Sequence, residues 1–455
     1  MSELTVSQAL GAWVDDFDLD SVPASAREAA RKTLVNTVGT AIGAYGLDDA
    51  GLAVDAVTAE GISGPSTVLA GGEKLPAMQA VYLNGILTCN LGQEETHITS
   101  GTHPAETTIP VVLSLAERLG STGPEVLAAI LVGIEVTVRV ASMDLTPAVK
   151  FDNCEAPAVY GTTGAAAAAA KLARLDRAGI VNAIGLGANL AAGLSEPVKF
   201  GSTEYHFTVG ASPMHGLMAY ELARQGGVAA DTVFEGDGGF YQLFGAADRA
   251  DLAEHDCVAD VMETLGEVWE IEELIYKPYP VNFFNQSPID GAAGIRSRNG
   301  LTAEDVKSVR LEIGELAAAS GGPNRQPYSS RGGVLGATGY CVASMLARGA
   351  VGLRETTDYE ASDILGILDK TEIVPVEGLM TARIKVETSS GDVYEFDHDE
   401  DGRDYRLDMG EIEEIAREAA ANVLSDEEAD RLVGALSAVE GTEDFAEIMK
   451  LTVKG

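Results

Sequence analysis

Two of the six histidines in the chain, His97 and His103, stand six residues apart in the polar stretch QEETHITSGTHPAETTIP. Pro104 favours an extended backbone at His103, and the apolar run VVLSLAERL that follows is typical of a buried helix. A histidine held in a loop just before such a helix is well placed to face a pocket. Because the pKa of histidine lies near neutrality, we expect His103 to act as an acid or a base.

The same stretch contains residue types that bind metal ions, namely His97, His103, Glu94 and Glu95. Their spacing matches neither the helical HxxxH pattern nor HExxH, so we expect no metal site here. The four cysteines lie far apart and include no CxxC pair, which disfavours a structural disulfide and an iron–sulfur cluster. They are Cys89, Cys154, Cys257 and Cys341.

Cations that suit acidic ligands occur in two later stretches. YKPYPVNFFNQSPIDGA places Lys277 in a loop, since its prolines exclude a regular helix. NRQPYSSRGGVLGATGY offers Arg325, Arg331 and Tyr340, and a guanidinium can bind a carboxylate through two parallel hydrogen bonds. By position alone, these residues are equally typical of a solvated linker or surface.

The elements that must position these residues are helical from Met1 to about Glu270. ASAREAARKTLVNTVGTAIGAY has apolar residues at helical spacing and a predicted N-cap at Ser25, and TGPEVLAAILVGIEVTVRVASM has Pro124 near its first turn. GLGANLAAG superficially matches a dinucleotide-binding loop, but no strand precedes it, which favours close helix packing. The small residues of this segment and of GTTGAAAAAAKLARLD predict a tight helical bundle.

The pattern changes near Lys277. KSVRLEIGEL and MTARIKVETSSGDVYEFD alternate apolar and polar residues, with SSGD as a hairpin turn, and GATGYCVASMLARGAVG reads as a helix between them. The C-terminal segment, from MGEIEEIAREAA onwards, is helical again. We therefore predict a mainly α protein, with a large all-helical domain of residues 1–272 and 405–455 and an inserted, smaller α+β domain of residues 273–404.

The composition is strongly acidic, with 31 Lys and Arg residues against 70 Asp and Glu residues and a formal net charge of −39. The acids are spread along the whole chain, which is typical of solubility in a salt-rich cytoplasm. No basic stripe indicates a nucleic-acid partner, and an anionic substrate would need a local cationic pocket. No apolar run is long enough for a membrane span, and the N-terminus lacks the features of a signal peptide, so we expect a cytoplasmic protein.

A series of segments, in order, resembles the MmgE/PrpD family, which includes 2-methylcitrate dehydratases and cis-aconitate decarboxylases. The resemblance covers most of the chain and implies a helical domain built from both chain ends, an inserted α+β lid and a homodimer. It also implies a site between the domains, a small di- or tricarboxylate substrate, and no metal or organic cofactor. The matching segments include TLVNTVGTAIGAYG, AVYLNG, THPAETTIPVVLSLAERLGSTGPEVLAAILVGIEV, YGTTGAAAAAAKLARLD, HGLMAYELARQGGVAADTVFEGDGGFYQLFG and KPYP.

Position by position, the resemblance assigns His103 to the histidine of the family's HP motif and Lys277 to the lysine of its K-x-x-P loop. Tyr340 matches a tyrosine of the lid helix, and Arg331 falls near the usual lid arginine. We expect His103 to transfer protons, Lys277 and Arg331 to bind carboxylates, and Tyr340 to donate a proton.

The chain also departs from the family pattern. GQEE stands in place of DxDD, so that Gly92 replaces the first Asp, whereas Glu94 and Glu95 replace the later pair. Glu94 is expected to supply the missing carboxylate, and His97 to belong to the same loop network. Further positions that match family site residues, and that we expect to bind substrate, are Glu155 for a histidine, Tyr205 with the adjacent His206 for a lysine, and Asn282 for a Cys or His.

The resemblance implies a lyase that dehydrates a small hydroxy tricarboxylate such as 2-methylcitrate. Dehydration needs a base beside a carboxylate, cations that stabilise the enolate-like charge, and an acid for the leaving hydroxyl. The substituted positions leave three alternatives open. These are decarboxylation of a cis-aconitate-like acid, isomerisation or epimerisation of a dicarboxylate, and a catalytically silent binding protein.

Overall fold

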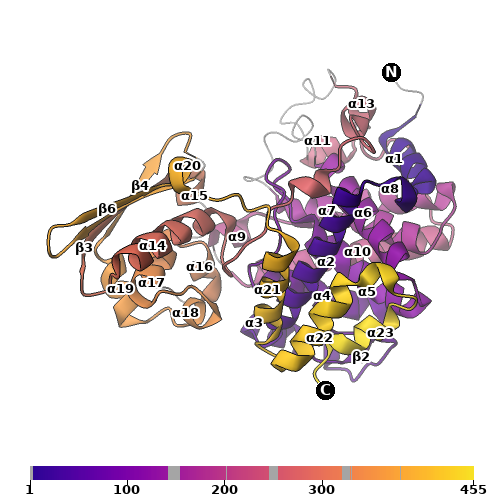
Figure 1. Ribbon diagram of the computed structural model, residues 1–455. Helices are drawn as coiled ribbons and strands as arrows, with labels where there is room; N and C mark the ends of the chain where they lie inside the picture. The colour runs from indigo at the N-terminus through magenta and orange to yellow at the C-terminus, as the bar shows by residue number, and fades with distance from the viewer. Residues whose placement is uncertain are drawn as a thin grey trace.

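A computed structural model describes residues 4–141, 154–200, 202–244, 255–319, 328, 330–379 and 381–455. The protein is mainly α-helical, with a smaller α+β region, as the sequence predicts. Its buried hydrophobic residues form two separate clusters, which we call the larger core and the smaller core. Figure 1 shows the smaller core, with its sheet, to one side of the helical body. No helix in the described ranges combines the length and the apolar character that a membrane crossing requires.

The larger core is built by helices from both ends of the chain (Figure 1). The C-terminal helices α21 (Met409–Ala420) and α22 (Asp426–Ser437) pack against α2 (Ala24–Gly43) from the N-terminal part. The remaining long helices of this core are α1 (Val6–Asp16), α3 (Asp48–Thr58), α4 (Ala77–Asn90), α5 (Pro104–Leu119), α6 (Gly123–Val140), α7 (Ala156–Leu172), α8 (Arg177–Leu190) and α10 (Glu204–Arg224).

Small residues bring these helices into close contact. A Cβ atom at Gly164 of α7 would lie 1.9 Å from Thr137 Oγ1 and 2.2 Å from the Gly133 carbonyl oxygen of α6. A Cβ at Gly187 of α8 would lie 3.1 Å from the Thr162 carbonyl oxygen of α7. The interpretation of GLGANLAAG as a packed helical segment is therefore confirmed up to the end of α8.

The predicted helix starts need one correction. Helix α6 begins with a capping box in which Thr122 and Glu125 bond each other's main-chain N–H, and Pro124 lies in its first turn as predicted. The prediction of Ser25 as an N-cap is wrong, since α2 already begins at Ala24. Pro23 takes the cap position because its ring favours the extended backbone that precedes a first helical residue.

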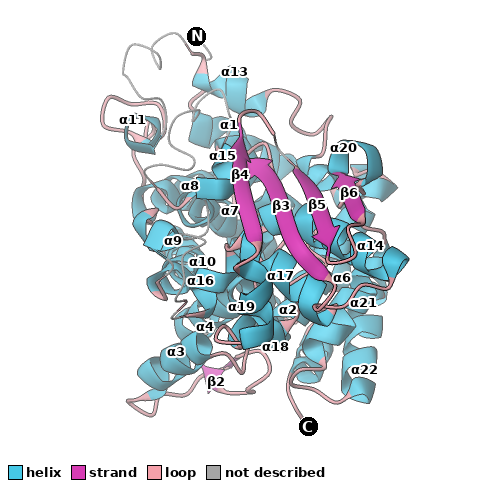
Figure 2. Ribbon diagram, turned by 90° about the vertical axis from the view of Figure 1, so that its left-hand side faces the viewer, coloured by secondary structure: helices cyan, strands magenta, loops and turns pink. Residues whose placement is uncertain are grey.

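The smaller core contains a four-stranded sheet in the order β4-β3-β5-β6 (Figure 2). Strand β3 (Val306–Gly314) is antiparallel to β5 (Ala382–Thr388), which forms a hairpin with β6 (Val393–Asp397) through the predicted SSGD turn. The edge strand β4 (Thr371–Val376) is parallel to β3. Helices that pack on the sheet or complete this core are α14 (Gln286–Asn299), α16 (Arg331–Leu335), α17 (Thr338–Arg348) and α19 (Ser362–Leu368), and the short helix α18 (Leu353–Thr357) lies against α16.

Two connectors join the cores, the first formed by residues 275–282 and the second by residues 402–408. They lie side by side, since the Tyr276 main-chain N–H donates to the Tyr405 carbonyl oxygen at 2.9 Å. Asp290 of α14 accepts hydrogen bonds from Tyr279 Oη at 2.9 Å and from Tyr405 Oη at 2.8 Å. One carboxylate thus fixes both connectors, and through the first it helps to position Lys277.

Candidate active site

The candidate site lies where the end of α4 and the beginnings of α5, α7 and α10 converge beside the first connector. His103 is the N-cap residue of α5, and Glu155 is that of α7. Tyr205 lies in the first turn of α10. Burial raises the pKa of Tyr205 well above its usual value, and the charges of Glu106, Glu155 and Glu94 raise it further, so these side chains lie close to one another.

The loop between α4 and α5 is fastened to the first connector, and this brings Glu94 to Lys277. Gln93 Nε2 donates to the carbonyl oxygens of Lys277 at 3.2 Å and Pro278 at 3.0 Å. Thr96 and Ile275 exchange two main-chain hydrogen bonds, at 2.9 and 3.0 Å. These contacts reach across more than 170 residues of sequence, which explains why spacing alone does not indicate them.

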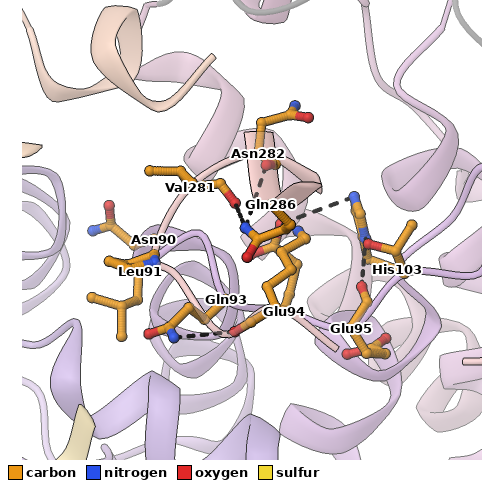
Figure 3. A network of polar contacts seen from close by, with 12 residues as sticks. Asn90, Leu91, Gln93, Glu94, Glu95, His103, Val281, Asn282 and Gln286 are labelled. Atoms are coloured by element: carbon orange, nitrogen blue, oxygen red, sulfur yellow. Dashed lines mark hydrogen bonds and ion pairs between the residues drawn. The ribbon is translucent and has the colours of Figure 1, made fainter. Parts of the chain in front are cut away.

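Lys277 and His103 both lie beside the same carboxylate oxygen, Glu94 Oε1. Lys277 Nζ, on a side chain only 2% exposed, donates a hydrogen bond to this oxygen. His103 Nε2 lies 4.0 Å from the same oxygen (Figure 3). Burial alone would raise the pKa of Glu94, but the charge of Lys277, together with the hydrogen bonds that the carboxylate accepts, outweighs it and lowers the pKa. Glu94 is therefore an ionised carboxylate.

His103 is arranged as a neutral base. Its Nδ1 lies 2.6 Å from the Glu95 carbonyl oxygen (Figure 3), and because a carbonyl only accepts, Nδ1 carries the proton. Nε2 therefore keeps its lone pair, at a distance from Glu94 too long for a hydrogen bond. Burial, followed by the charge of Lys277, lowers the pKa of His103 to about 4. Near neutral pH the imidazole can accept a proton at Nε2.

Three further buried carboxyl groups surround this arrangement. Burial raises the pKa of Glu95 to about 7, although its Oε1 accepts a hydrogen bond from the Ala105 N–H at 2.7 Å. Burial, together with the charge of Glu94, raises the pKa of Glu155 to about 8. Burial and the charges of Glu94 and Glu95 raise the pKa of Glu106 well above its usual value. Protonated Glu155 is thus a potential proton donor near Glu94.

Glu106 is a site residue that the sequence analysis missed. Its side chain is fully buried in the first turn of α5, and neither carboxyl oxygen has a hydrogen-bond partner among the described residues. Its charge also raises the pKa of Cys89, after burial itself. The available signal was a carboxylate three residues after His103, at the start of a helix whose other buried residues are mostly apolar.

Arg331 is engaged with main-chain oxygens. Its Nη1 donates to the Asn90 carbonyl at 2.6 Å, and its Nη2 to those of Leu91 at 2.7 Å and Pro280 at 3.3 Å. The guanidinium thus satisfies carbonyls at the end of α4 and ties α16 to the larger core. Burial lowers its pKa to about 10, still far above neutrality. Arg325, named with it from the sequence, lies outside the described residues.

Two other predicted residues bond main-chain groups within the smaller core. Tyr340 Oη lies 3.0 Å from the Glu355 carbonyl oxygen and 2.9 Å from that of Asp358. Asn282 Oδ1 accepts from the Phe284 N–H at 3.0 Å and begins a short 3-10 helix. In this structure both side chains brace the local backbone near α17 and the first connector.

The two remaining predicted histidines contact carboxylates other than Glu94. His97 Nδ1 accepts from the Ser100 N–H at 3.1 Å, so Nε2 carries the proton and donates to Glu270 at 3.1 Å. This fixes the loop that precedes His103. His206 Nδ1 lies 2.8 Å from Asp49 Oδ2 of α3. The neighbouring Tyr205, by contrast, lies near the buried carboxyl groups of Glu106, Glu155 and Glu94.

The carboxyl groups do not make an evident metal site. Within the part of the chain that the structure describes, no group of three or more His, Cys, Asp and Glu side chains is arranged to hold a metal ion. What the site does present is a neutral imidazole, an ammonium and protonated carboxyl groups around one ionised glutamate. Such groups can abstract a proton, stabilise an enolate-like charge and protonate a leaving group.

Comparison with known proteins places the chain in a family. The model of the MmgE/PrpD N-terminal domain matches residues 8–253, and that of the MmgE/PrpD C-terminal domain matches residues 279–438. A cis-aconitate decarboxylase-like protein, oryM, from Aspergillus oryzae is 24% identical over 479 residues, covering 99% of this chain and 97% of the relative. The cis-aconitate decarboxylase of Homo sapiens is 23% identical over 405 residues, covering 84% and 80%. Because the two family models together span most of its length, the chain belongs to the MmgE/PrpD family.

Proposed function

We propose that this chain is a cofactor-independent lyase that eliminates water from a small hydroxy acid. The observation that carries the proposal is the arrangement of two groups around Glu94 Oε1. Lys277 Nζ contacts this oxygen, and the unprotonated Nε2 of His103 lies 4.0 Å from it. A base and a cation are thereby held against one carboxylate in a buried site. The family assignment supports lyase chemistry of this kind.

The proposed elimination uses three groups. His103 Nε2 takes the proton from the carbon beside the substrate carboxylate, and the Lys277 ammonium stabilises the enolate-like charge that forms. Protonated Glu155 gives its proton to the leaving hydroxyl, which departs as water. Imidazolium at His103 and carboxylate at Glu155 remain, and proton exchange with solvent restores both for the next turnover.

Decarboxylation is the second candidate, because the curated relatives are named for it. In this reaction the substrate loses CO₂ and the resulting carbanion-like centre gains a proton. Lys277 would again stabilise the developing charge, and protonated Glu155 would supply the proton. No base is needed to remove a proton from carbon, so the two reactions differ in their need for an unprotonated His103.

The experiment that separates them incubates the purified chain with hydroxy and unsaturated acids in D₂O, including 2-methylcitrate and cis-aconitate. Products, released CO₂ and deuterium incorporation are followed by NMR. His103→Gln and Glu155→Gln are compared with the control His255→Gln, which alters a histidine whose ring contacts the nearby Asp260 at 2.9 Å.

For elimination, we expect water loss that falls about 10²- to 10⁴-fold in His103→Gln and is unchanged in His255→Gln. Decarboxylation that survives His103→Gln but not Glu155→Gln would favour the second candidate. Deuterium exchange without loss of water or CO₂ would indicate an isomerase instead. If no acid is turned over or exchanged, the lyase proposal is refuted.

A further inference from the structure

We infer that Glu270 is a positioning residue for His103 and that it acts through His97. This inference rests on the proposed function, in which His103 is the base, and it names what holds that base in place. Glu270 reaches His103 through the His97 ring and the loop of residues 97–102, and Glu270 is itself held by α6.

The imidazole of His103 depends on both ends of the loop of residues 97–102. Its main chain follows Thr102 directly, whereas its ring contacts the two residues that precede the loop. Nδ1 lies 2.6 Å from the Glu95 carbonyl oxygen and 3.3 Å from Thr96 Oγ1. A movement of the loop therefore turns His103 Nε2 relative to Glu94.

The loop is closed at its base and supported from inside by the His97 ring. The His97 N–H donates to the Thr102 carbonyl oxygen at 2.9 Å, and the Thr102 N–H donates back at 3.4 Å. The ring nitrogen Nδ1 accepts from the Ser100 N–H at 3.1 Å, and both His97 and Ser100 are 2% exposed. Since the tip residue Ile98 is exposed, the loop depends on the His97 ring rather than on burial of its tip.

Glu270 is the partner of this ring on its other side. Because Nδ1 accepts, Nε2 carries the proton, and it donates to Glu270 Oε2 at 3.1 Å. This hydrogen bond, helped by the charge of Arg139, outweighs burial and holds the pKa of Glu270 below its ordinary value. The acceptor is thus an ionised carboxylate, which makes the hydrogen bond a strong one.

The contact with Glu270 gives the loop a second attachment to the same segment. The first is the pair of main-chain hydrogen bonds between Thr96 and Ile275. A loop fastened at one place can still swing about it, whereas two attachments fix its direction. The hydrogen bond from His97 to Glu270 therefore determines the direction in which the loop leads into His103.

Glu270 is itself held by α6. Arg139 Nη2 lies 3.6 Å from Glu270 Oε1 and donates to the Val268 carbonyl oxygen at 2.9 Å. Glu135 Oε1 accepts from the Ile271 N–H at 3.1 Å. Because α6 packs against α5 and α7, these contacts connect the loop to the interior of the helical bundle.

The first test needs no substrate. The full chain is labelled with 15N-histidine, and NMR at pH 7 shows which ring nitrogen of each histidine carries the proton. His97→Gln and His103→Gln assign the signals. In the unaltered chain we expect the proton on Nδ1 of His103 and on Nε2 of His97. Glu270→Ala should make His103 exchange between its two tautomers, whereas Glu270→Gln, whose amide oxygen still accepts from His97, should keep the original pattern.

A matched control lies on the same short 3-10 helix, which spans residues 270–273. Glu273→Ala also removes a carboxylate, one that pairs with Arg406 instead of His97. It should leave the signals of both histidines unchanged. If Glu273→Ala disturbs His103 as much as Glu270→Ala does, general weakening of this segment explains the effect and the inference is refuted.

The second test is kinetic and uses 2-methylcitrate and cis-aconitate. Displacing a reacting group impairs the chemical step more than binding, so Glu270→Ala should lower kcat at least about tenfold and change KM less than about twofold. Glu270→Gln should recover most of the lost kcat, and Glu273→Ala should lose none. Thermal unfolding of each variant identifies the temperatures at which all of them are folded.

The two tests separate this inference from the proposed function. An unchanged His103 pattern in Glu270→Ala overturns the inference, whether or not the chain is active. An unchanged kcat in Glu270→Ala also overturns it, but leaves the lyase proposal standing. If the His103 pattern changes as expected and neither acid is turned over, the lyase proposal loses support while the link from Glu270 to His103 stands.

Discussion

His103 and Glu155 have complementary roles at the residue scale because burial acts in opposite directions on a base and on an acid. Removal from water disfavours the charged form of each group. It therefore lowers the pKa of His103 to about 4 and raises that of Glu155 to about 8. Between these values the imidazole is unprotonated and the carboxyl group protonated, which is the combination that elimination requires.

This combination predicts a bell-shaped pH dependence of kcat/KM. Activity should rise with pH as His103 loses its proton near pH 4, and fall as Glu155 loses its proton near pH 8. Steady-state kinetics between pH 4 and 10 test this wherever circular dichroism shows a folded chain. Glu155→Gln should lower the activity and remove the alkaline limb. Activity that still rises above pH 9 would contradict the assignment of the acid.

Glu94 and Lys277 should be strongly coupled in stability. Glu94→Gln leaves the ammonium without its counter-charge in a buried site, which typically costs about 3–5 kcal/mol. In the double variant with Lys277→Met no such charge remains, so the loss should be smaller than the sum of the single losses by roughly 1–3 kcal/mol. Urea unfolding of the four proteins measures this cycle. Additive losses would show that the two side chains do not depend on each other.

Part of the site could be predicted from the sequence, because histidines are few in this chain and because Lys277 lies in a recognisable loop motif. His103 stands out among few histidines, and Lys277 lies in a proline-rich loop, which together indicated the residues that meet at Glu94. Glu106 was missed because periodicity does not say which distant carboxyl groups a helix faces. As an arginine, Arg331 was expected to donate hydrogen bonds to oxygen atoms. That its partners are main-chain carbonyls follows only from the tertiary structure.

At the scale of elements, the close packing of α6 against α7 depends on glycines, Gly133 and Gly164. Gly164→Ala would place a methyl group within 2.2 Å of the Gly133 carbonyl oxygen, which is main chain and cannot turn aside. We expect a loss of about 1–3 kcal/mol or more, measured by urea unfolding. Gly434→Ala is the matched control, since its Cβ would meet nothing within 4 Å on the exposed face of α22 and should stabilise the chain by roughly 0.5–1 kcal/mol. Equal effects at both positions would refute this account of the bundle.

The elements themselves were predicted best where local chemistry defines their ends. Pro124 lies in the first turn of α6 as predicted, and the SSGD turn joins β5 to β6. Strand β4 was not predicted, because it is short, contains Pro375 and lies at the edge of the sheet. Proline is compatible with a strand only in such a position, which no local pattern identifies before the sheet order is known.

For the whole molecule, the formal net charge of −39 is the dominant electrostatic fact. Acids at the surface repel one another in the folded state, and the repulsion acts over about 10 Å at 0.1 M salt but only about 3 Å at 1 M. The buried carboxyl groups of the site avoid this cost differently, by remaining protonated. Salt should therefore stabilise the chain through its surface rather than through its site.

We expect the midpoint of thermal unfolding to rise by several degrees as NaCl increases from about 0.1 to 2 M. The comparison protein carries Glu60→Lys, Glu360→Lys and Glu443→Lys, three exposed positions that lie apart in the sequence. Since each exchange removes a negative charge and adds a positive one, this variant should melt higher than the unaltered chain at 0.1 M and gain less from added salt. At 2 M, where screening leaves little repulsion to relieve, the two melting points should approach each other. If both proteins gain equally from salt, general salting-out of apolar surface, and not charge repulsion, governs the stability of the molecule.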